Sequence, residues 1–211
     1  MSLKDIDIDY VYRSYGESSI SEMINPILSE SIFYKRSVGF FSSSSLNITA
    51  EGILNIVNSN GKIQILASPH ISEDDKKAIE LGYKYKDSVI KDSFIIDFEN
   101  ALSSMPEKNL CLLCELISSG FIDIKIVLTK GFGDYHDKFA IIGDSENNIV
   151  VFNGSANESK NGLKENYERI FVFKNWEKSG TVYVNDDLQE FDLLWNGKHP
   201  FNETYSLNKV A

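Results

Sequence analysis

The stretch that decides the fold is Tyr135–Phe173, which reads YHDKFAIIGDSENNIVVFNGSANESKNGLKENYERIFVF. It contains two apolar segments, DKFAIIGD and NIVVFNG, separated by the polar residues Asp144–Asn148. Short apolar runs bounded by turn-forming residues are typical of strands joined in a hairpin. We therefore expect a hairpin here, followed by another strand over Glu168–Lys174.

Four polar side chains stand at the outer ends of this hairpin. His136 and Lys138 are two residues apart at the start of the first strand, and Ser155 and Asn157 are two apart at the end of the second. Because side chains alternate along a strand, each pair shares one face, and the two pairs can converge at one end of the sheet. An imidazole, a cation and two neutral donors suit the binding and attack of a phosphate.

The order of these residues resembles the signature of the phospholipase D superfamily, which is His-x-Lys, an apolar strand, an aspartate and then Gly-Ser-x-Asn. This sequence reads HDKFAIIGD and then GSAN, and the clear match covers about Tyr135–Phe173. One departure is the aspartate, which follows the lysine after four residues in the family and after five here, at Asp144. Some nuclease members lack this aspartate, so the shift weakens Asp144 as a functional residue more than it weakens the resemblance.

The resemblance implies a role for each residue of the motif. His136 attacks the phosphodiester and forms a phosphohistidine intermediate. Lys138, Ser155 and Asn157 bind the phosphate, and Lys138 and Asn157 neutralise charge on its non-bridging oxygens. Lysine and imidazolium then do what a metal cation would do, so we expect neither a metal nor another cofactor.

The family also places a glutamate about eleven residues after the motif asparagine, where it orients the histidine. Counting from Asn157 gives Glu168, and Glu165 is the weaker alternative. A carboxylate that hydrogen-bonds a histidine fixes the orientation of the ring and supports its charged form. The resemblance therefore adds Glu168 to the candidate catalytic residues.

The implied mechanism needs a second histidine, which protonates the leaving oxygen and then activates water. The chain has one motif, and neither His70 nor His199 lies in a His-x-Lys pattern. We expect a homodimer in which two copies of His136 meet at a two-fold axis, as in single-motif nucleases of the superfamily. The alternative is a fragment whose second motif has been cut off. His70 is expected to be structural or solvated, and His199 solvated.

The rest of the chain alternates between strand and helix patterns. Further strands are expected at Val38–Phe41, Lys62–Ser68 and Ile122–Thr129. Helices are expected at Ser18–Ser29, Ala50–Val57, Ser72–Leu81, Asp92–Leu102, Glu107–Ile117 and Asp186–Trp195. The pattern predicts an α/β fold, a phospholipase D-like mixed β-sheet flanked by helices on both faces, in a single domain over residues 1–211.

Several other residues receive a structural interpretation. Arg36 and Arg169 are expected to be surface charges, although either could contact DNA phosphates. Tyr135 and Phe139 are interpreted as packing residues, and the acidic run Glu73–Asp75 as the start of a helix. Two cysteines in NLCLLCELI are interpreted as core residues, because a structural zinc site needs four ligands and no second pair follows.

Composition limits the class of protein. In 211 residues, 42% are apolar and 25% charged, which is typical of a globular protein with a substantial core. The formal net charge of −10 argues against coating of nucleic acid by bulk electrostatics, but it allows a locally basic cleft. No apolar run approaches the roughly 20 residues that cross a bilayer. With no signal peptide in MSLKDIDIDY, we expect a cytoplasmic protein without membrane contact.

The fold leaves the substrate open, since the superfamily includes enzymes that act on phospholipid, DNA or RNA, and inactive members. The single motif and the expected cytoplasmic location favour nucleic acid, with DNA ahead of RNA, and an endonuclease. The segments RSVGFF, NGKIQILASPHISEDD and FDLLWNG also resemble N-terminal domains of bacterial restriction and defence proteins that carry a DEAD/DEAH-type helicase module. Such a module in cis would supply the grip on DNA. A phospholipid phosphodiesterase or phosphatidyltransferase, and a silent DNA-binding or dimerisation module, are the alternatives.

Overall fold

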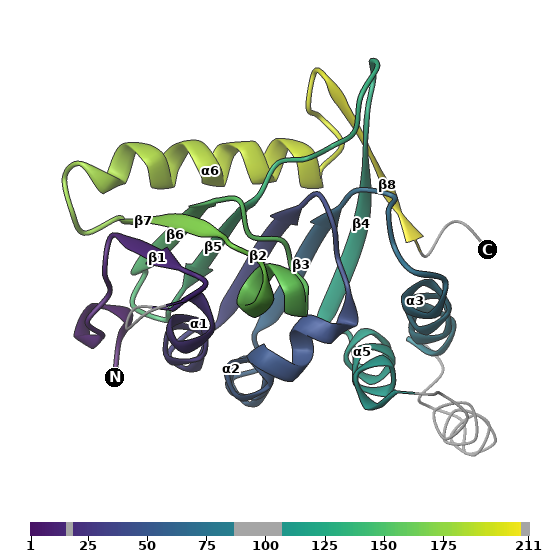
Figure 1. Cartoon of the computed structure of the whole chain (residues 1–211), viewed down its shortest axis with the longest axis horizontal. Helices are drawn as coiled ribbons and strands as arrows, with labels where there is room; N and C mark the ends of the chain where they lie inside the picture. The colour runs from purple at the N-terminus through teal and green to yellow at the C-terminus, as the bar shows by residue number, and fades with distance from the viewer. Residues whose placement is uncertain (16–18, 87–106, 208–211) are drawn as a thin grey trace.

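The structure is a computed structural model, and it describes residues 1–15, 19–86 and 107–207. One eight-stranded sheet runs through it in the order β1-β7-β6-β5-β2-β3-β4-β8 (Figure 1). The strands are β1 (Val11–Arg13), β2 (Phe33–Val38), β3 (Lys62–Ala67), β4 (Ile122–Thr129), β5 (Phe139–Gly143), β6 (Ile149–Gly154), β7 (Arg169–Lys174) and β8 (Asn202–Ser206). β2, β3 and β4 are parallel, and all other neighbours pair antiparallel, so the sheet is mixed as predicted.

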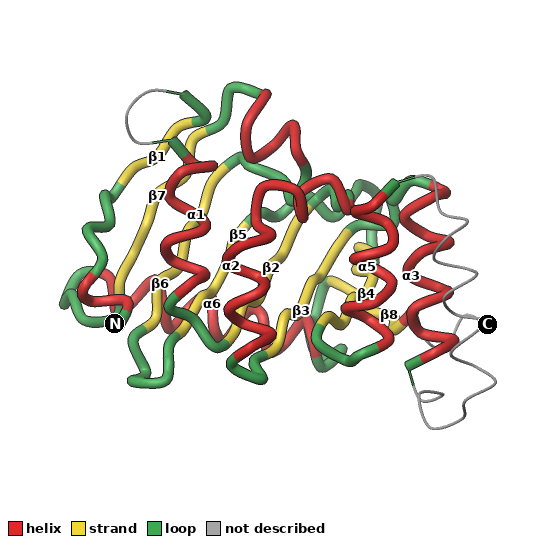
Figure 2. The backbone as a smooth tube through the Cα atoms, turned by 90° about the horizontal axis from the view of Figure 1, so that it is seen from below, coloured by secondary structure: helices red, strands yellow, loops and turns green. Residues whose placement is uncertain are grey.

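Helices cover both faces of this sheet. They are α1 (Ile20–Ser29), α2 (Leu46–Asn58), α3 (Glu73–Tyr85), α5 (Lys108–Ser118) and α6 (Gly180–Trp195), with the single turns η1 (Leu3–Asp5), η2 (Ser43–Ser45) and η3 (Asn161–Glu165). α6 lies alone across one face, and α1, α2, α5 and α3 lie side by side on the other (Figures 1 and 2). The α/β fold with helices on both faces is therefore confirmed. Within the described residues, every helix is too short or too polar to span a membrane.

The central hairpin contributes side chains to the hydrophobic cores on both faces of the sheet. All five residues of β5 are buried, which is typical of a strand covered on both faces. Phe139 and Ile141 belong to the core under α6, whereas Ala140 and Ile142 belong to the core under the other four helices. β5 pairs with β6 in the predicted hairpin. The period of two along β5 therefore sends alternate side chains to opposite cores.

The position of β2 differs from the prediction. A strand was expected at Val38–Phe41, but β2 is Phe33–Val38 and lies between β5 and β3. The segment looked polar in sequence because it contains Lys35 and Arg36. Arg36 is nevertheless 1% exposed, since it pairs with a buried carboxylate, and the chain leaves the sheet after Val38.

Several helices begin at other residues than expected. Apolar spacing indicates the middle of a helix clearly, whereas capping residues indicate its first residue less clearly. The side chain of Ser72 caps α3 by accepting from the Asp75 backbone N–H, at the start of the helix expected there. α2 begins at Leu46 and α6 at Gly180, several residues before the expected starts. The two short outer strands, β1 and β8, were missed. The helix expected at Asp92–Leu102 lies outside the described residues.

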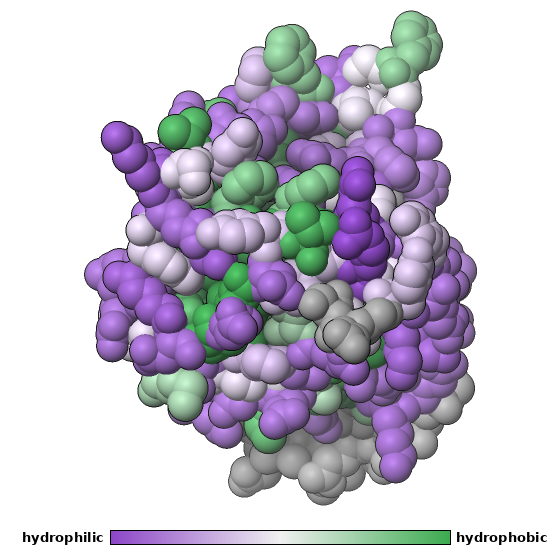
Figure 3. All heavy atoms as spheres, turned by 60° about the vertical axis from the view of Figure 1, so that its left-hand side comes forward, coloured by the Kyte–Doolittle hydropathy of each residue, from purple (hydrophilic) through white to green (hydrophobic). Residues whose placement is uncertain are grey.

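The strand directions bring a defined set of loops to one edge of the sheet. β2, β3, β4 and β6 end at this edge, and β5 and β7 begin there. The segments around Gly39, Ser68, His136 and Asn157 therefore meet at the same edge. The turn between β5 and β6 lies at the opposite edge. One face of the molecule is dominated by hydrophilic residues, with hydrophobic ones in scattered spots (Figure 3).

Candidate active site

His136 and Lys138 are in direct contact just before β5. The Lys138 ammonium Nζ lies 3.0 Å from Nδ1 of His136 and donates to the His136 backbone carbonyl at 2.8 Å. Lys138 is 8% exposed, whereas His136 is exposed to solvent. Both residues precede the strand, which begins at Phe139, so the expected alternation along a strand is wrong here. They meet because the lysine side chain folds back onto the histidine.

Because Gly39 has no side chain, it leaves room for the side chains of His136 and Lys138. A Cβ atom at residue 39 would lie 2.8 Å from Cδ2 of His136 and 3.2 Å from Nζ of Lys138. The Ser68 hydroxyl donates to the Gly39 carbonyl at 2.6 Å and ties this backbone to the end of β3. We therefore consider Gly39 a positioning residue. Gly39 was not among the residues expected at the site, and the signal that marks it is a glycine directly after a buried strand that ends there.

Asn157 is held at the same edge by the loop that follows β2. Its side-chain oxygen Oδ1 accepts a hydrogen bond from the Phe40 backbone N–H at 3.0 Å. This bond uses the acceptor end of the amide, so the NH₂ group points the other way with two donors. Such donors can bind a non-bridging phosphate oxygen.

Ser155 joins the hairpin to the start of β7. Its hydroxyl accepts from the Arg169 N–H at 3.2 Å, and its own N–H donates to the Arg169 carbonyl at 3.1 Å. Next to it, the Gly154 N–H donates to the Lys138 carbonyl at 3.2 Å. Because the hydroxyl accepts from the backbone, its own proton is available to a ligand.

Glu168 is the buried carboxylate of this region. It is 7% exposed, its N–H donates to the Ser14 hydroxyl at 2.7 Å, and Asn166 donates to its carboxylate at 3.3 Å. Among the described residues, no hydrogen bond joins Glu168 to His136. Its negative charge instead acts on Lys138. Glu165 is exposed and pairs with Lys160 at 2.6 Å, so Glu168 is the better placed of the two candidates.

A buried ion pair supports the GSAN segment from below. Nε of Arg36 donates to the Glu158 carboxylate at 3.1 Å, and the Tyr34 hydroxyl donates to the same oxygen at 2.7 Å. Arg36 also donates to the Ala156 carbonyl. The expectation that Arg36 is a surface charge is therefore wrong, since the guanidinium lies beneath the site.

The charges around Lys138 oppose one another. Burial lowers the pKa of its ammonium, and the positive charge of Arg36 lowers it further. The carboxylates of Asp137 and Glu168 act in the opposite direction but do not cancel the shift. Binding of an anion stabilises a cation that is buried beside another cation. The surroundings of Lys138 therefore favour the binding of a phosphate.

Comparison with known proteins assigns a family to this arrangement. The family model described as "Cardiolipin synthase, PLD-like domain" matches residues 37–195, which is more than half of the chain. The chain belongs to the phospholipase D-like family. This membership supports phosphodiester hydrolase activity. A search of curated proteins found no match.

Two solved structures share the fold of this phospholipase D-like chain. NucT from Helicobacter pylori aligns with a TM-score of 0.51 and 17% identity, over 89% of this chain and 90% of that chain. The phospholipase D family member Nuc from Salmonella typhimurium aligns with a TM-score of 0.52 and 13% identity, over 93% and 96% of the two chains. The phospholipase D-like sheet expected from the sequence is thus confirmed.

Asp144 lies far from the other motif residues. It follows β5, whereas Lys138 precedes it, and six residues of extended chain span about 20 Å. Its carboxylate accepts from the N–H groups of Leu3, Glu146 and Asn148, and from the Asn148 amide. Burial opposes the charged form, but these hydrogen bonds outweigh it and lower the pKa of Asp144. We infer that Asp144 closes the hairpin turn and anchors the N-terminal segment.

The other two histidines have different surroundings. His70 lies in the loop after β3, at the same edge as the motif, with Nε2 3.5 Å from the Asp134 carboxylate and a side chain that is 61% exposed. The His199 side chain is only 11% exposed, and Nε2 lies 3.1 Å from the Glu190 carboxylate. Its Nδ1 lies 2.8 Å from the Asn202 amide. The expectation that His199 is solvated is therefore wrong.

Two aromatic residues beside the motif and the two cysteines lie in or near the core. Tyr135 and Phe139 are buried and pack in the core under α6, as predicted. Cys114 is buried in α5, and this burial raises the pKa of its thiol to about 12. Cys111 on the same helix is half-buried. In the described ranges, no group of three or more His, Cys, Asp or Glu side chains is arranged to hold a metal ion.

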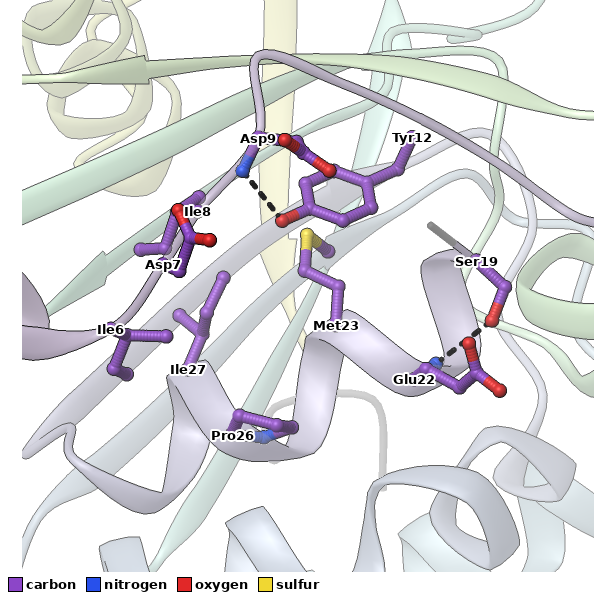
Figure 4. A pocket seen from close by; sticks show the side chains of 10 residues that line it. All are labelled: Ile6, Asp7, Ile8, Asp9, Tyr12, Ser19, Glu22, Met23, Pro26 and Ile27. Carbon is purple, nitrogen blue, oxygen red and sulfur yellow. Dashed lines mark hydrogen bonds between the residues drawn. The ribbon is translucent and has the colours of Figure 1, made fainter. Parts of the chain in front are cut away.

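Two hollows adjoin the sheet. One has a volume of about 340 Å³ and lies beside Asn157. Its lining consists of Asn157, Phe40, Ser42, Ser44, Ser159, Asn161 and Asn166. The other, of about 220 Å³, lies between the N-terminal segment and α1 (Figure 4). Its lining includes Met23 and Ile27 together with the carboxylates of Asp7, Asp9 and Glu22. Those carboxylates disfavour an anionic substrate there.

Proposed function

We propose that this chain is a metal-independent nuclease that hydrolyses DNA through a phosphohistidine on His136. The observation that carries the proposal is the contact between Lys138 Nζ and His136 Nδ1. Around this contact, the sheet edge also carries the donors of Ser155 and Asn157 and the carboxylate of Glu168. The fold shared with NucT and Nuc supports nucleic acid as the substrate class.

The hydrogen bond of Lys138 defines the resting state of the nucleophile. A charged ammonium can only donate, so Nδ1 accepts and a neutral imidazole then carries its proton on Nε2. Nε2 cannot attack while it holds that proton. When a phosphodiester binds, Lys138 turns to a non-bridging oxygen, and the exposed ring releases its Nε2 proton to solvent and takes one up at Nδ1. Glu168 is the carboxylate that we propose to stabilise this protonated nitrogen.

The reaction then proceeds in two displacements. The Nε2 lone pair forms a bond to phosphorus as the bond to the leaving oxygen breaks, and a second histidine gives that oxygen its proton. The same histidine next takes a proton from water, the resulting hydroxide attacks phosphorus, and the phosphorus–nitrogen bond breaks. Lys138 and Asn157 stabilise the charge on the non-bridging oxygens in both steps.

We propose that the second histidine is His136 of another copy, in a homodimer with the site at its two-fold axis. A specific observation favours one rival source. His70 stands at the same sheet edge and pairs with Asp134, which is two residues before His136. A His70→Asn variant separates the two, because the homodimer keeps its activity in this variant and the rival arrangement loses it.

Phospholipid is the second candidate substrate, because the family model is described by a cardiolipin synthase. A lipid enzyme needs apolar surface at the mouth of its site. The hollow beside Asn157 is instead lined mainly by serine and asparagine, which favours nucleic acid. We further propose a cytoplasmic role in restriction or defence for a single domain over 1–211. A helicase module in cis would compensate for the net charge of −10.

The test is cleavage of plasmid and single-stranded DNA in excess EDTA by wild type, His136→Asn and His70→Asn, with sizing chromatography of each protein. Phosphatidylcholine and phosphatidylglycerol vesicles form the lipid arm. The proposal expects EDTA-resistant DNA cleavage by a dimer, lost in His136→Asn and kept in His70→Asn. Lipid hydrolysis without DNA cleavage would replace it by the second candidate, and turnover of neither substrate would favour the silent module.

A further inference from the structure

The hollow beside Asn157 has an unusual lining for a site that handles phosphate. Six of its seven lining residues are serine or asparagine, and the seventh is Phe40, which is 38% exposed. None of the described residues that line it carries a charge. We call this hollow the Ser/Asn groove.

The groove is continuous with the catalytic centre. Asn157 belongs to both, and its side-chain oxygen accepts from the N–H of Phe40. Phe40 directly follows Gly39, where an added Cβ atom would lie 2.8 Å from the His136 ring. On the far side, Asn166 lines the groove and donates to the Glu168 carboxylate. A diester bound at His136 therefore directs one of its substituents toward the groove.

The polar groups of the groove are poised to donate. The hydroxyl oxygens of Ser42, Ser44 and Ser159 each accept a hydrogen bond from a backbone N–H. Their own O–H protons are therefore available to a ligand. Asn161 is exposed and adds an amide that can both donate and accept.

This chemistry excludes two classes of substituent and fits a third. A second phosphate needs cations, and the described lining has none. An acyl chain needs an apolar lining, and here only Phe40 is apolar. A nucleoside has a flat base that stacks on an aromatic ring, together with sugar hydroxyls and base edges that hydrogen-bond to hydroxyls and amides. The volume, about 340 Å³, lies at the lower end of small-molecule sites.

We propose that the Ser/Asn groove binds the nucleoside next to the scissile phosphate, with its base stacked on Phe40 and its polar edges bonded to Asn161 and the serine hydroxyls. This inference rests on the proposed nuclease function and names a subsite for it. A base that stacks on Phe40 is unstacked from its neighbours and unpaired. The groove therefore selects single-stranded substrate over duplex.

The test uses substitutions at Phe40 and one matched control. Phe40→Ala removes the ring, Phe40→Leu keeps apolar volume without a ring, and Phe40→Tyr keeps the ring. Phe171→Ala is the control, because Phe171 on β7 is exposed to a similar extent, 40%, and lies outside the groove lining. Melting temperatures confirm that each variant is folded.

Each protein is assayed on bis(4-nitrophenyl) phosphate, which has no nucleoside, and on single-stranded oligonucleotides with one cleavable diester and methylphosphonates elsewhere. The measured quantity is the ratio of kcat/KM for the oligonucleotide to kcat/KM for the small diester. The inference expects this ratio to fall about tenfold in Phe40→Ala and Phe40→Leu, the size of one lost stacking contact. It expects no change in Phe40→Tyr or Phe171→Ala.

A second arm replaces the base on either side of the cleavable diester by an abasic residue. Wild type should lose about tenfold with one of the two abasic oligonucleotides, and Phe40→Ala should lose nothing further with it. An unchanged ratio in Phe40→Ala, or equal abasic losses in both proteins, contradicts the proposed nucleoside subsite. If the small diester is still hydrolysed in that case, the proposed phosphodiesterase function stands. If wild type hydrolyses neither substrate, the proposed function fails. Fluorescence anisotropy with intact and abasic oligonucleotides then decides the groove alone.

Discussion

The guanidinium of Arg36 donates to the Glu158 carboxylate 3.1 Å away, and the two side chains are only 2% and 4% exposed. Arg36 is on β2, in the middle of the sheet, and Glu158 directly follows Asn157. The Tyr34 hydroxyl donates to the same carboxylate oxygen. The pair thus fastens the end of the hairpin that we propose to bind phosphate to the centre of the sheet.

Removal of Arg36 should cost more free energy of unfolding than removal of any exposed charge. Arg36→Ala leaves the Glu158 carboxylate buried without its cation, and breaking such a pair costs about 3–5 kcal/mol. Urea denaturation of wild type and variant gives the difference. Arg169→Ala, at an exposed arginine of β7, is the control and should stay within about 0.5 kcal/mol. A cost below about 1 kcal/mol for Arg36→Ala would contradict the account of the buried pair.

A methyl group at Gly39 should reduce turnover more than stability. In Gly39→Ala the new Cβ would lie 2.8 Å from Cδ2 of His136, so the ring or the loop must move. A displacement of a reacting group by about 1 Å can cost on the order of a hundredfold in rate. Hydrolysis of bis(4-nitrophenyl) phosphate measures kcat, and thermal denaturation shows that the variant is folded.

Gly131→Ala is the control for this substitution, since a Cβ at residue 131 would have no neighbour within 4 Å. Its kcat should equal that of wild type. If Gly39→Ala is folded and also keeps the wild-type kcat, Gly39 does not position His136.

The hairpin and its motif were predictable because their signals are local. The apolar runs, the polar turn, and the pairs His136/Lys138 and Ser155/Asn157 are each read within a few residues, and the structure has the hairpin that they predict. The way in which Lys138 and His136 meet could not be predicted from the local pattern. Lys138 reaches His136 by folding back from a loop, so the residues meet for a different reason than alternation along a strand.

Features that depend on a distant partner were missed. β2 contains Lys35 and Arg36, and only the carboxylate of Glu158, far along the chain, makes it a buried strand. Gly39 acquires its role from His136, which lies 97 residues further along the chain. A sequence gives no indication of such pairings when the partners are separated by tens of residues or more.

Asp144→Asn should lower stability and leave catalysis unchanged. The carboxylate accepts four hydrogen bonds, and an amide in its place has one acceptor atom, so the cost is about 1–3 kcal/mol. The folded-state pKa of Asp144 is lowered below its usual 3.8. Its charge therefore stabilises the fold above that value, and the contribution is lost as the pH falls through the folded-state pKa.

Melting temperatures from pH 7 down to pH 3 test this prediction. The difference between wild type and Asp144→Asn should be largest at pH 7 and shrink below about pH 4. The kcat of the folded variant on bis(4-nitrophenyl) phosphate should match wild type. A variant with wild-type stability and lost kcat would instead return Asp144 to the catalytic residues.

Asp187→Asn should stabilise the protein at high pH. Burial raises the pKa of Asp187 to about 6, although the Asn153 amide donates to its carboxylate, and Asp186, Asp137 and Glu190 add to the increase. Because the folded-state pKa is raised, the stabilising contribution is fully present below the unfolded value of 3.8 and is lost as the pH rises through about 6. The melting temperature of the variant should exceed that of wild type at pH 8 and equal it near pH 4. The opposite trend would contradict the raised pKa.

The central claim is that His136 is the nucleophile, and trapping the covalent intermediate tests it most directly. Wild-type protein is mixed with a single-stranded oligonucleotide, quenched at early times in alkali, where a phosphohistidine survives, and digested for mass spectrometry. The account predicts a nucleotide or phosphate adduct on the peptide that contains His136, which is absent without substrate and absent in His136→Asn. An adduct on another residue, or wild-type turnover by His136→Asn, would contradict it.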